Sequence, residues 1–314
     1  MPCPWQRLYA RVTFETAMGL ATSDGQWEQA GFKVKQSGLG LTRAGDIADV
    51  AYLASGDATF EDCVALDGGH VWDDGTVRGD EGVAVIGEWL GSCLTRVNSR
   101  MPELARFGFG RHLGIVKQGL LMEVIQKKRR AEIVDGAGLW DKARLQAMSA
   151  PRSGSWLEAH PNRALNLQLT NAEVQYGVGR RLGCVLCEER PCPFCLGVMD
   201  TFGVHCESCT AGGDKTVNRD LVRDGLYVHS RRAHTAPRLE ACGVSRLLGL
   251  DDRGDGQVRP ADVLLCRAQD IQTSVGPAGA GRVALDVGII CPQAAGHLDN
   301  AAAEPLGAAE DYVD

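Results

Sequence analysis

Four metal-binding side chains lie close together in the second half of the chain. Cys192, Cys195, His205 and Cys209 follow the pattern C-x2-C-x9-H-x3-C within the stretch CPFCLGVMDTFGVHCESC. Zinc prefers thiolate and imidazole ligands, and structural zinc sites are closed by four of them in a tetrahedron. The C-x2-C turn supplies one pair, and H-x3-C places the second pair on one side of a helical turn. The spacing therefore predicts a structural Zn²⁺ with no coordination position left for catalysis.

Three further cysteines leave the ligand assignment open. Cys184 and Cys187 form another C-x2-C pair, which could replace one of the two pairs or hold a second ion, and Cys206 lies inside the cluster itself. The alternative without metal is a set of unconnected buried thiols and a surface histidine. Because so small a segment has no core of its own, a bound ion would have to supply the free energy that folds it.

A second candidate site consists of carboxylates in apolar surroundings. Asp262 stands at the entrance of the apolar run VLLC, and Asp286 lies inside the run VALDVGII. Burying such a carboxylate is unfavourable unless it is paired or bound to metal. Together with Glu240, the two aspartates would form an oxygen-rich Mg²⁺ site that polarises a phosphodiester and activates water. The simpler alternative is a capping role for Asp262 and a salt bridge between Asp286 and an arginine.

Hydrophobic periodicity predicts the helices that must position these residues. Apolar residues recur every three or four positions in three segments, and a capping box of the S/T-x-x-E type marks a fourth. The predicted helices are 44–52, about 112–150, 170–182 after the box T-N-A-E, and 216–229. The run KKRR at 127–130 reads most simply as the solvated basic end of a helix, and the alternative is a phosphate-contacting patch.

Strands are predicted only near the C-terminus. Three short apolar runs at 239–244, 261–266 and 283–290 are separated by loops rich in Gly, Asp and Pro. The expected fold class is α+β, with a mainly helical N-terminal part, a small zinc knuckle and then a small α/β sheet.

Composition indicates a globular chain: 44% of its 314 residues are hydrophobic and 23% are charged. It has no run of about 18 apolar residues, and its N-terminus lacks the apolar core of a signal peptide, so an intracellular protein without a membrane partner is expected. In that setting twelve cysteines indicate reduced thiols and metal ligands rather than disulfides.

The net charge of −7 is unevenly distributed. Residues 1–183 carry 21 basic and 21 acidic residues, whereas residues 184–314 carry 12 and 19. Nucleic-acid binding rests on neutralising phosphates with Lys and Arg, so an acidic half argues against a simple nucleic-acid coat. It does not argue against a nuclease, whose metal ligands are acidic.

Three stretches, in this order, resemble the C-terminal part of non-LTR (LINE-type) retrotransposon reverse transcriptases that carry a restriction-like endonuclease. The first is W-E-Q-A-x4-K-Q-S-G-L-G-L followed by A-Y-L-A-S, at 27–55. The second is the Cys/His cluster, with Met199, Asp200 and Gly203 between its pairs. The third consists of GGDKT at 212–216, R-P-A-D-V-L-L at 259–265 and A-L-D-V at 284–287. Together they cover roughly residues 20–60 and 150–292.

This resemblance implies a polyprotein that nicks its DNA target and copies its own RNA from the exposed end, with DNA and element RNA as partners and no small-molecule substrate. Asp262 and Asp286 match the Mg²⁺ carboxylates of the endonuclease, Glu240 matches a further acidic position, and the four Cys/His residues match the zinc ligands. The implied divisions are a reverse-transcriptase thumb-like remnant (1–63), a loop-rich insertion (64–111), a helical linker (112–183), the zinc knuckle (184–210), an endonuclease-like domain (211–292) and a disordered tail (293–314).

Departures from the family pattern predict an incomplete catalytic set. The sequence VWDD at 71–74 is the nearest candidate for polymerase carboxylates, yet it follows the region where the family's palm ends. Gly288 stands where related nucleases carry a lysine, and no lysine follows Lys215. The helix position where relatives often carry Arg-His reads Asn218-Arg219. The expected product is a fragment with impaired nicking; the alternatives are a non-catalytic zinc-dependent module that binds nucleic acid or protein, and a relic without selected function.

Overall fold

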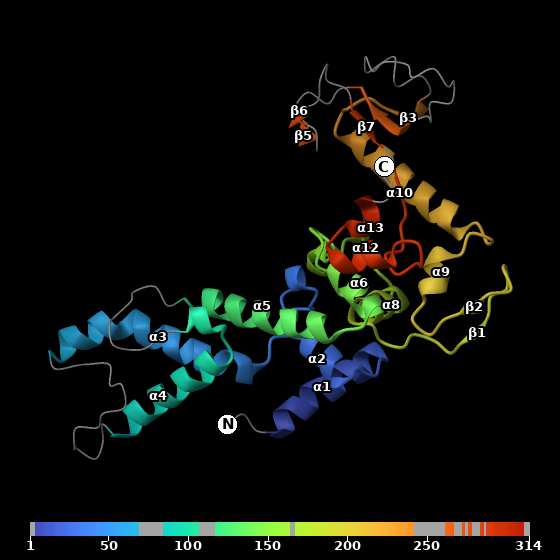
Figure 1. Cartoon of the computed structure of the whole chain (residues 1–314). Coiled ribbons are helices and arrows are strands. Elements are labelled where there is room, and N and C mark those ends of the chain that lie inside the picture. The colour runs from blue at the N-terminus through green and yellow to red at the C-terminus, as the bar shows by residue number, and fades with distance from the viewer. Residues whose placement is uncertain are drawn as a thin grey trace. The chain divides into compact units, whose positions relative to one another are not determined.

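The structure is a computed structural model that describes residues 4–68, 84–106, 117–163, 167–241, 261–266, 272–273, 276–277, 283–285 and 287–310 (Figure 1). The chain forms two compact units: unit 1 comprises Met1–Glu188 and Pro292–Asp311, and unit 2 comprises Glu189–Cys291 and Tyr312–Asp314. Helices and small antiparallel sheets are both present, which confirms the α+β class in general terms.

Unit 1 is helical throughout its described residues. Its elements are α1 (Pro4–Met18), α2 (Asp24–Ala30), the 3₁₀ turn η1 (Val34–Gln36), α3 (Ala44–Leu66), α4 (Ala84–Ser99), η2 (Glu103–Ala105), α5 (Gln118–Gly136), α6 (Leu139–Ala147), α7 (Ser155–Glu158), α8 (Asn171–Leu182), α12 (Leu298–Ala303) and α13 (Gly307–Glu310).

One apolar core joins α3, α4 and α5. Val50 and Leu53 of α3, Val97 of α4 and Ile125 of α5 are its most deeply buried members. The helix predicted at 44–52 is confirmed and runs on to Leu66. The expectation of a loop-rich 64–111 missed α4, because the Gly- and Asp-rich sequence before it hides the helical spacing that follows.

Within the segment 112–150, the described residues 117–150 hold two helices rather than the single one expected. α5 ends at Gly136 and α6 begins at Leu139, with Ala137 between them in an extended conformation. Glycine is the least favourable helix residue after proline, and Gly136 and Gly138 flank this point. The break lets α6 fold back towards α5.

The basic run 127–130 lies inside α5 and is paired, so it is neither a solvated helix end nor an open phosphate patch. The partners are Glu123 for Lys127, Glu132 for Lys128, Asp46 for Arg129, and the Leu145 carbonyl for Arg130. Burial alone would raise the pKa of Asp46, but Arg43 and Arg129 hold that pKa below its ordinary value. The two lysines therefore pair within α5, while Arg129 and Arg130 fasten α5 to α3 and α6.

A second core surrounds α8, where Val178 and Leu182 pack with Ala30 of α2. The predicted capping box is confirmed: the Thr170 hydroxyl accepts from the Glu173 N–H at 3.3 Å, and the Glu173 carboxylate accepts from the Thr170 N–H at 2.6 Å. Cys184 completes this core at 1% exposure. The zinc knuckle expected from 184 therefore starts later, because residues up to Glu188 belong to unit 1.

The Ser-Gly-Leu-Gly turn at 37–40 is tied to the end of α8. Arg181, which is 1% exposed, donates from Nε to the Gly38 carbonyl at 2.8 Å and from Nη2 to the Val34 carbonyl. Gln29 donates from Nε2 to the carbonyl of Ser37 at 2.8 Å and to that of Arg181 at 3.0 Å. Segment 27–41 thus wraps the buried guanidinium in carbonyl oxygens.

The disordered tail expected at 293–314 is wrong for residues 293–310, which belong to unit 1 and include two short helices. α12 packs against α6, and Ala301 and Ala308 are buried (Figure 1). The Gln293 amide oxygen accepts from Arg180 Nη2 at 2.9 Å. Small alanine side chains allow the helices to pack this closely. The same alanine-rich composition, taken alone, had suggested a tail.

Unit 2 combines short strands with two helices. Its elements are β1 (Arg190–Pro191), β2 (Val198–Met199), α9 (Val204–Ser208), α10 (Asp214–Arg232), β3 (Pro237–Ala241), β4 (Ala261–Leu265), β5 (Gln272–Thr273), β6 (Gly276–Pro277) and β7 (Val283–Leu285). The predicted helix 216–229 and the three predicted strands are present as α10, β3, β4 and β7.

The main sheet of unit 2 has the order β3-β4-β7 with all neighbours antiparallel. Val263 lies at its centre, opposite Leu239 on one side and Leu285 on the other. Tyr227 of α10 packs against the small core formed by Val263, Leu265 and Val283. One face of α10 is thereby fixed on the sheet.

Candidate metal centre and carboxylate pairs

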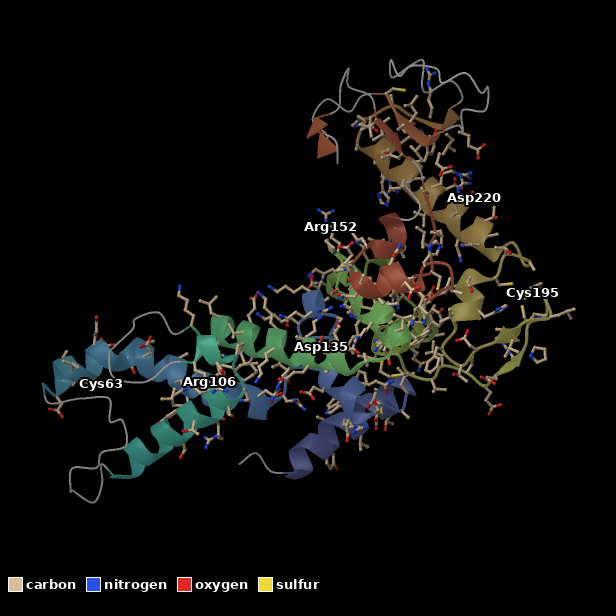
Figure 2. All side chains as sticks on the ribbon, viewed as in Figure 1. Cys63, Arg106, Asp135, Arg152, Cys195 and Asp220 are labelled. Carbon is tan, nitrogen blue, oxygen red and sulfur yellow. The ribbon has the colours of Figure 1, made fainter. Side chains whose placement is uncertain are left out.

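A hairpin and a short helix bring the four predicted zinc ligands together. β1 and β2 pair with Arg190 opposite Met199, and the connection between them carries Cys192 and Cys195. The Cys192 N–H donates to the Gly197 carbonyl at 2.7 Å and closes this turn. α9 carries His205, and Cys209 follows directly as its C-cap, so the frame is strand, strand, helix (Figures 1 and 2).

The ligand atoms lie close to the spacing that a tetrahedral ion requires. All four lie within 4.8 Å of one another, with Cys195 Sγ at 3.2 Å from His205 Nε2 and Cys192 Sγ at 4.0 Å from Cys209 Sγ. Zinc bonds of about 2.0–2.3 Å put tetrahedral ligands roughly 3.3–3.8 Å apart. Cys192, Cys195, His205 and Cys209 therefore fit a metal ion such as zinc, and no other such group occurs within the described parts of the chain.

Asp200 holds the helix that presents His205. Its Oδ1 accepts from the N–H groups of Phe202 at 2.9 Å and Val204 at 3.1 Å, and its Oδ2 accepts from the His205 N–H at 2.6 Å. Burial would raise the pKa of Asp200, but these donors outweigh it and lower the pKa below the ordinary range. A side chain noted only as part of a resemblance thus positions a metal ligand.

The hairpin turn leaves little room for a side chain at Gly197. A Cβ there would lie 3.1 Å from His205 Cε1 and 3.2 Å from Cys195 Sγ. Contacts this short would push the histidine and the thiol away from the shared centre. The glycine therefore keeps the two ligand pairs close together.

The cluster favours ionisation of the Cys192 thiol and opposes a second thiolate at Cys195. The Phe194 N–H, aided by His205 and the Cys195 N–H, lowers the pKa of the Cys192 thiol to about 6. The Gly197 N–H favours the Cys195 thiolate, yet burial and the adjacent sulfurs of Cys192 and Cys209 raise the pKa of Cys195 overall. Crowded sulfur charges of this kind are relieved by a cation placed among them.

The second C-x2-C pair does not join this cluster. Cys184 is packed in the α8 core of unit 1, where burial raises its pKa. Neither Cys187 nor Cys206 is among the grouped ligands. The sulfur ligands of the cluster are therefore those at positions 192, 195 and 209.

The predicted nuclease carboxylates are placed very differently. Asp262 begins β4 and is 1% exposed; its Oδ1 accepts from Arg219 Nη2 and its Oδ2 from the Val287 N–H at 2.7 Å. Glu240 of β3 is exposed, and its Oε1 lies 2.6 Å from Arg223 Nη1. Asp286 lies outside the described residues. The arginine salt bridge considered for Asp286 is thus found at Asp262.

The described carboxylates do not form a magnesium site. Mg²⁺ requires near-octahedral oxygen ligands. Both oxygens of Asp262 already accept hydrogen bonds from nitrogen, and Glu240 is bonded to a guanidinium. Neither carboxylate belongs to a grouped ligand set among the described residues.

The pairing of two arginines on α10 with these carboxylates escaped the sequence analysis. Arg219 and Arg223 are spaced four apart, and Tyr227, which packs on the sheet, follows at the same interval. Positions i, i+4 and i+8 share one helix face. That spacing was the available signal that both arginines face the strands carrying Asp262 and Glu240.

None of the described helices is long and apolar enough to cross a membrane. Comparison of the chain with protein-family models, curated proteins and solved structures found no match in any of the three.

Proposed function

We propose that the chain is a fragment of a non-LTR retroelement polyprotein whose unit 2 binds nucleic acid through a zinc-stabilised finger. The Cys₃His group on its strand-strand-helix frame carries this proposal. Such a frame, closed by zinc, presents a small rigid surface to nucleic acid. The order of the cluster, GGDKT, R-P-A-D and A-L-D-V stretches supports the retroelement origin.

The surface beside the finger suits an unpaired nucleotide. Arg190 and Phe194 line a hollow of about 400 Å³ together with His205, and Phe194 is 60% exposed. An exposed aromatic ring offers a stacking platform for a base, and a neighbouring guanidinium offers a phosphate contact. Element RNA and single-stranded DNA are therefore the partners that fit this hollow.

A basic ridge at the end of α10 suits the phosphate backbone. Residues 225–239 contain no acidic residue, and five basic side chains in this stretch are exposed: His229, Arg231, Arg232, His234 and Arg238. No ion pair joins the three arginines to another described residue. Localised positive charge of this kind supplies phosphate contacts even in a unit that is acidic overall.

The proposal includes DNA nicking, but only as a weak residual activity. The proposed intracellular role is to hold DNA and element RNA rather than to cut efficiently. An Mg²⁺-dependent nicking assay on a supercoiled plasmid, comparing the natural chain with Asp262→Ala, measures any residual activity. Equal activity in the two proteins would remove Asp262 from any catalytic role.

Apolar side chains on the finger favour a protein-binding module as the second candidate. Leu196 is 96% exposed and Val198 is 61% exposed, both next to Phe194. Docking on such a surface depends little on salt, whereas phosphate binding weakens steeply as salt rises.

Fluorescence anisotropy with the zinc-loaded full chain tests the proposal, using labelled 20-nucleotide RNA, single-stranded DNA and duplex DNA as separate arms. Replacing Arg231, Arg232 and Arg238 together by Gln should weaken binding at least tenfold and reduce the slope of log K against log salt by about 2–3. The matched control replaces Lys35, Lys127 and Lys128, which are paired with glutamates in unit 1, and should change the slope little. Absence of binding in every arm, or binding insensitive to salt, would favour the protein-binding module.

A further inference from the structure

The two described nuclease carboxylates are the ends of one chain of ion pairs. Arg219 bonds to Asp262 and also to Asp220 at 3.3 Å, and Arg223 lies 3.1 Å from Asp220 and 2.6 Å from Glu240. We refer to these five residues as the α10 ion-pair chain. Arg223 additionally contacts Asp224 at 2.9 Å. Figure 2 shows Asp220 on α10.

The helix holds both arginines in fixed positions. Tyr227 packs on the sheet core, and Arg219 and Arg223 lie two turns and one turn before it on the same face. The side chain of Arg223 is only 14% exposed, and hydrogen bonding to Asp224, reinforced by the charges of Asp220 and Glu240, raises its pKa. The side chain of Arg223 is therefore largely buried in unit 2, whereas that of Arg219 stays 37% exposed while it reaches the buried Asp262.

Asp262 needs a positive partner wherever it stays ionised. Its side chain is 2% exposed, and an isolated buried carboxylate is strongly unfavourable. Arg219 supplies that charge, and the Val287 N–H bonds to the second oxygen. A divalent cation is the other partner that would meet this need, and it would require the oxygen that Arg219 occupies.

We infer that Arg219 and Arg223 take the place of a divalent cation at Asp262 and Glu240. The negative charges of these two carboxylates are then compensated without Mg²⁺. A guanidinium spreads one charge over a planar fork and has no open coordination position. It holds the carboxylates in place but does not bind and activate a water as Mg²⁺ does. This inference concerns cation binding and stands whether or not unit 2 contacts nucleic acid.

Manganese binding to the zinc-loaded full chain tests the inference, with free Mn²⁺ read from its electron paramagnetic resonance signal. The natural chain and Asp262→Asn should bind Mn²⁺ equally, because Asp262 holds no Mn²⁺ in the natural chain. Arg219→Met should bind Mn²⁺ at least tenfold more tightly than the natural chain, and adding Asp262→Asn should abolish the gain. Arg219→Lys keeps the positive charge and should behave like the natural chain.

Arg96→Met is the matched control, because Arg96 forms a comparable ion pair with Asp49 in unit 1. It should leave Mn²⁺ binding unchanged. Natural chain that binds Mn²⁺ through Asp262, or a folded Arg219→Met protein with no gain, would overturn the inference. If circular dichroism shows that Arg219→Met is unfolded, the Mn²⁺ affinities of the natural chain and Asp262→Asn decide the question by themselves.

Discussion

Asp200 and Asp262 show how the donors around a carboxylate determine its role. Three backbone N–H groups surround Asp200 and turn it into the cap of α9. Arg219 and one backbone N–H surround Asp262 and compensate its charge without a metal ion. The same residue type therefore supports a metal site in one place and pairs with an arginine in the other.

Replacing Asp200 should weaken metal binding without touching a ligand. Asp200→Ala removes three acceptor contacts and frees α9, so zinc affinity should fall about 10–100-fold, as for other groups that orient metal ligands. Asp200→Asn keeps one acceptor oxygen and should lose less. Competition with a fluorescent zinc chelator measures both, and equal affinity in Asp200→Ala and the natural chain would show that the cap is dispensable.

The zinc ligands could be predicted because their pattern is local in sequence. Cys192, Cys195, His205 and Cys209 lie within 18 residues, so spacing alone limits their geometry. The partner of Asp262 is 43 residues away on α10, and no spacing rule links the two. Contacts between distant segments are what the sequence analysis could not supply.

Among the elements, the turn at 37–40 shows how a short loop can be fixed by one distant side chain. Arg181 at the end of α8 fills the space under the turn, and Gly38 passes close to the preceding chain. A Cβ at Gly38 would lie 2.0 Å from the Phe32 carbonyl oxygen. The close approach of the Phe32 backbone therefore requires glycine at this position.

Gly38→Ala should be strongly destabilising. The clash is with backbone that cannot swing aside, so the free energy of unfolding of unit 1 should fall by about 2–4 kcal/mol. Gly119→Ala is the control, because a Cβ at that helical position meets nothing within 4 Å, and it should be neutral or stabilising by up to about 1 kcal/mol. Urea unfolding followed by circular dichroism compares the two; similar midpoints would mean that the turn relaxes.

Local signals predicted elements well where they were explicit. The capping box at Thr170 led to a correct helix, because this signal acts within a few residues. α4 and the terminal helices α12 and α13 carry no cap that stands out, and their helical state depends on packing against other parts of unit 1. Helices that depend on such packing are difficult to predict from the local sequence.

At the scale of the whole molecule, the two units depend on different sources of stability. Unit 1 has two apolar cores built by helices. Unit 2 has one small core and a finger whose strands are two residues long. The finger is too small to fold by apolar burial alone, so a bound ion would contribute most of its stability.

Removal of zinc should therefore affect the two units unequally. A strong chelator should raise amide exchange across 190–209 at least a hundredfold, while the amides of α3, α5 and α8 stay protected. Hydrogen exchange with mass spectrometry follows both regions in one sample. Loss of protection throughout unit 1 would show instead that the units fold together.

The return of residues 292–310 to unit 1 makes unit 2 an insertion with two covalent attachments. A protease that cuts once within 189–291 therefore separates the chain into two peptides that remain bound through α12 on α6 and through Gln293 on Arg180. Native electrophoresis would show one species where a denaturing gel shows two. A nicked protein of this kind keeps its size and its helices, so cleavage within the insertion would pass unnoticed in any assay that reads only the intact assembly.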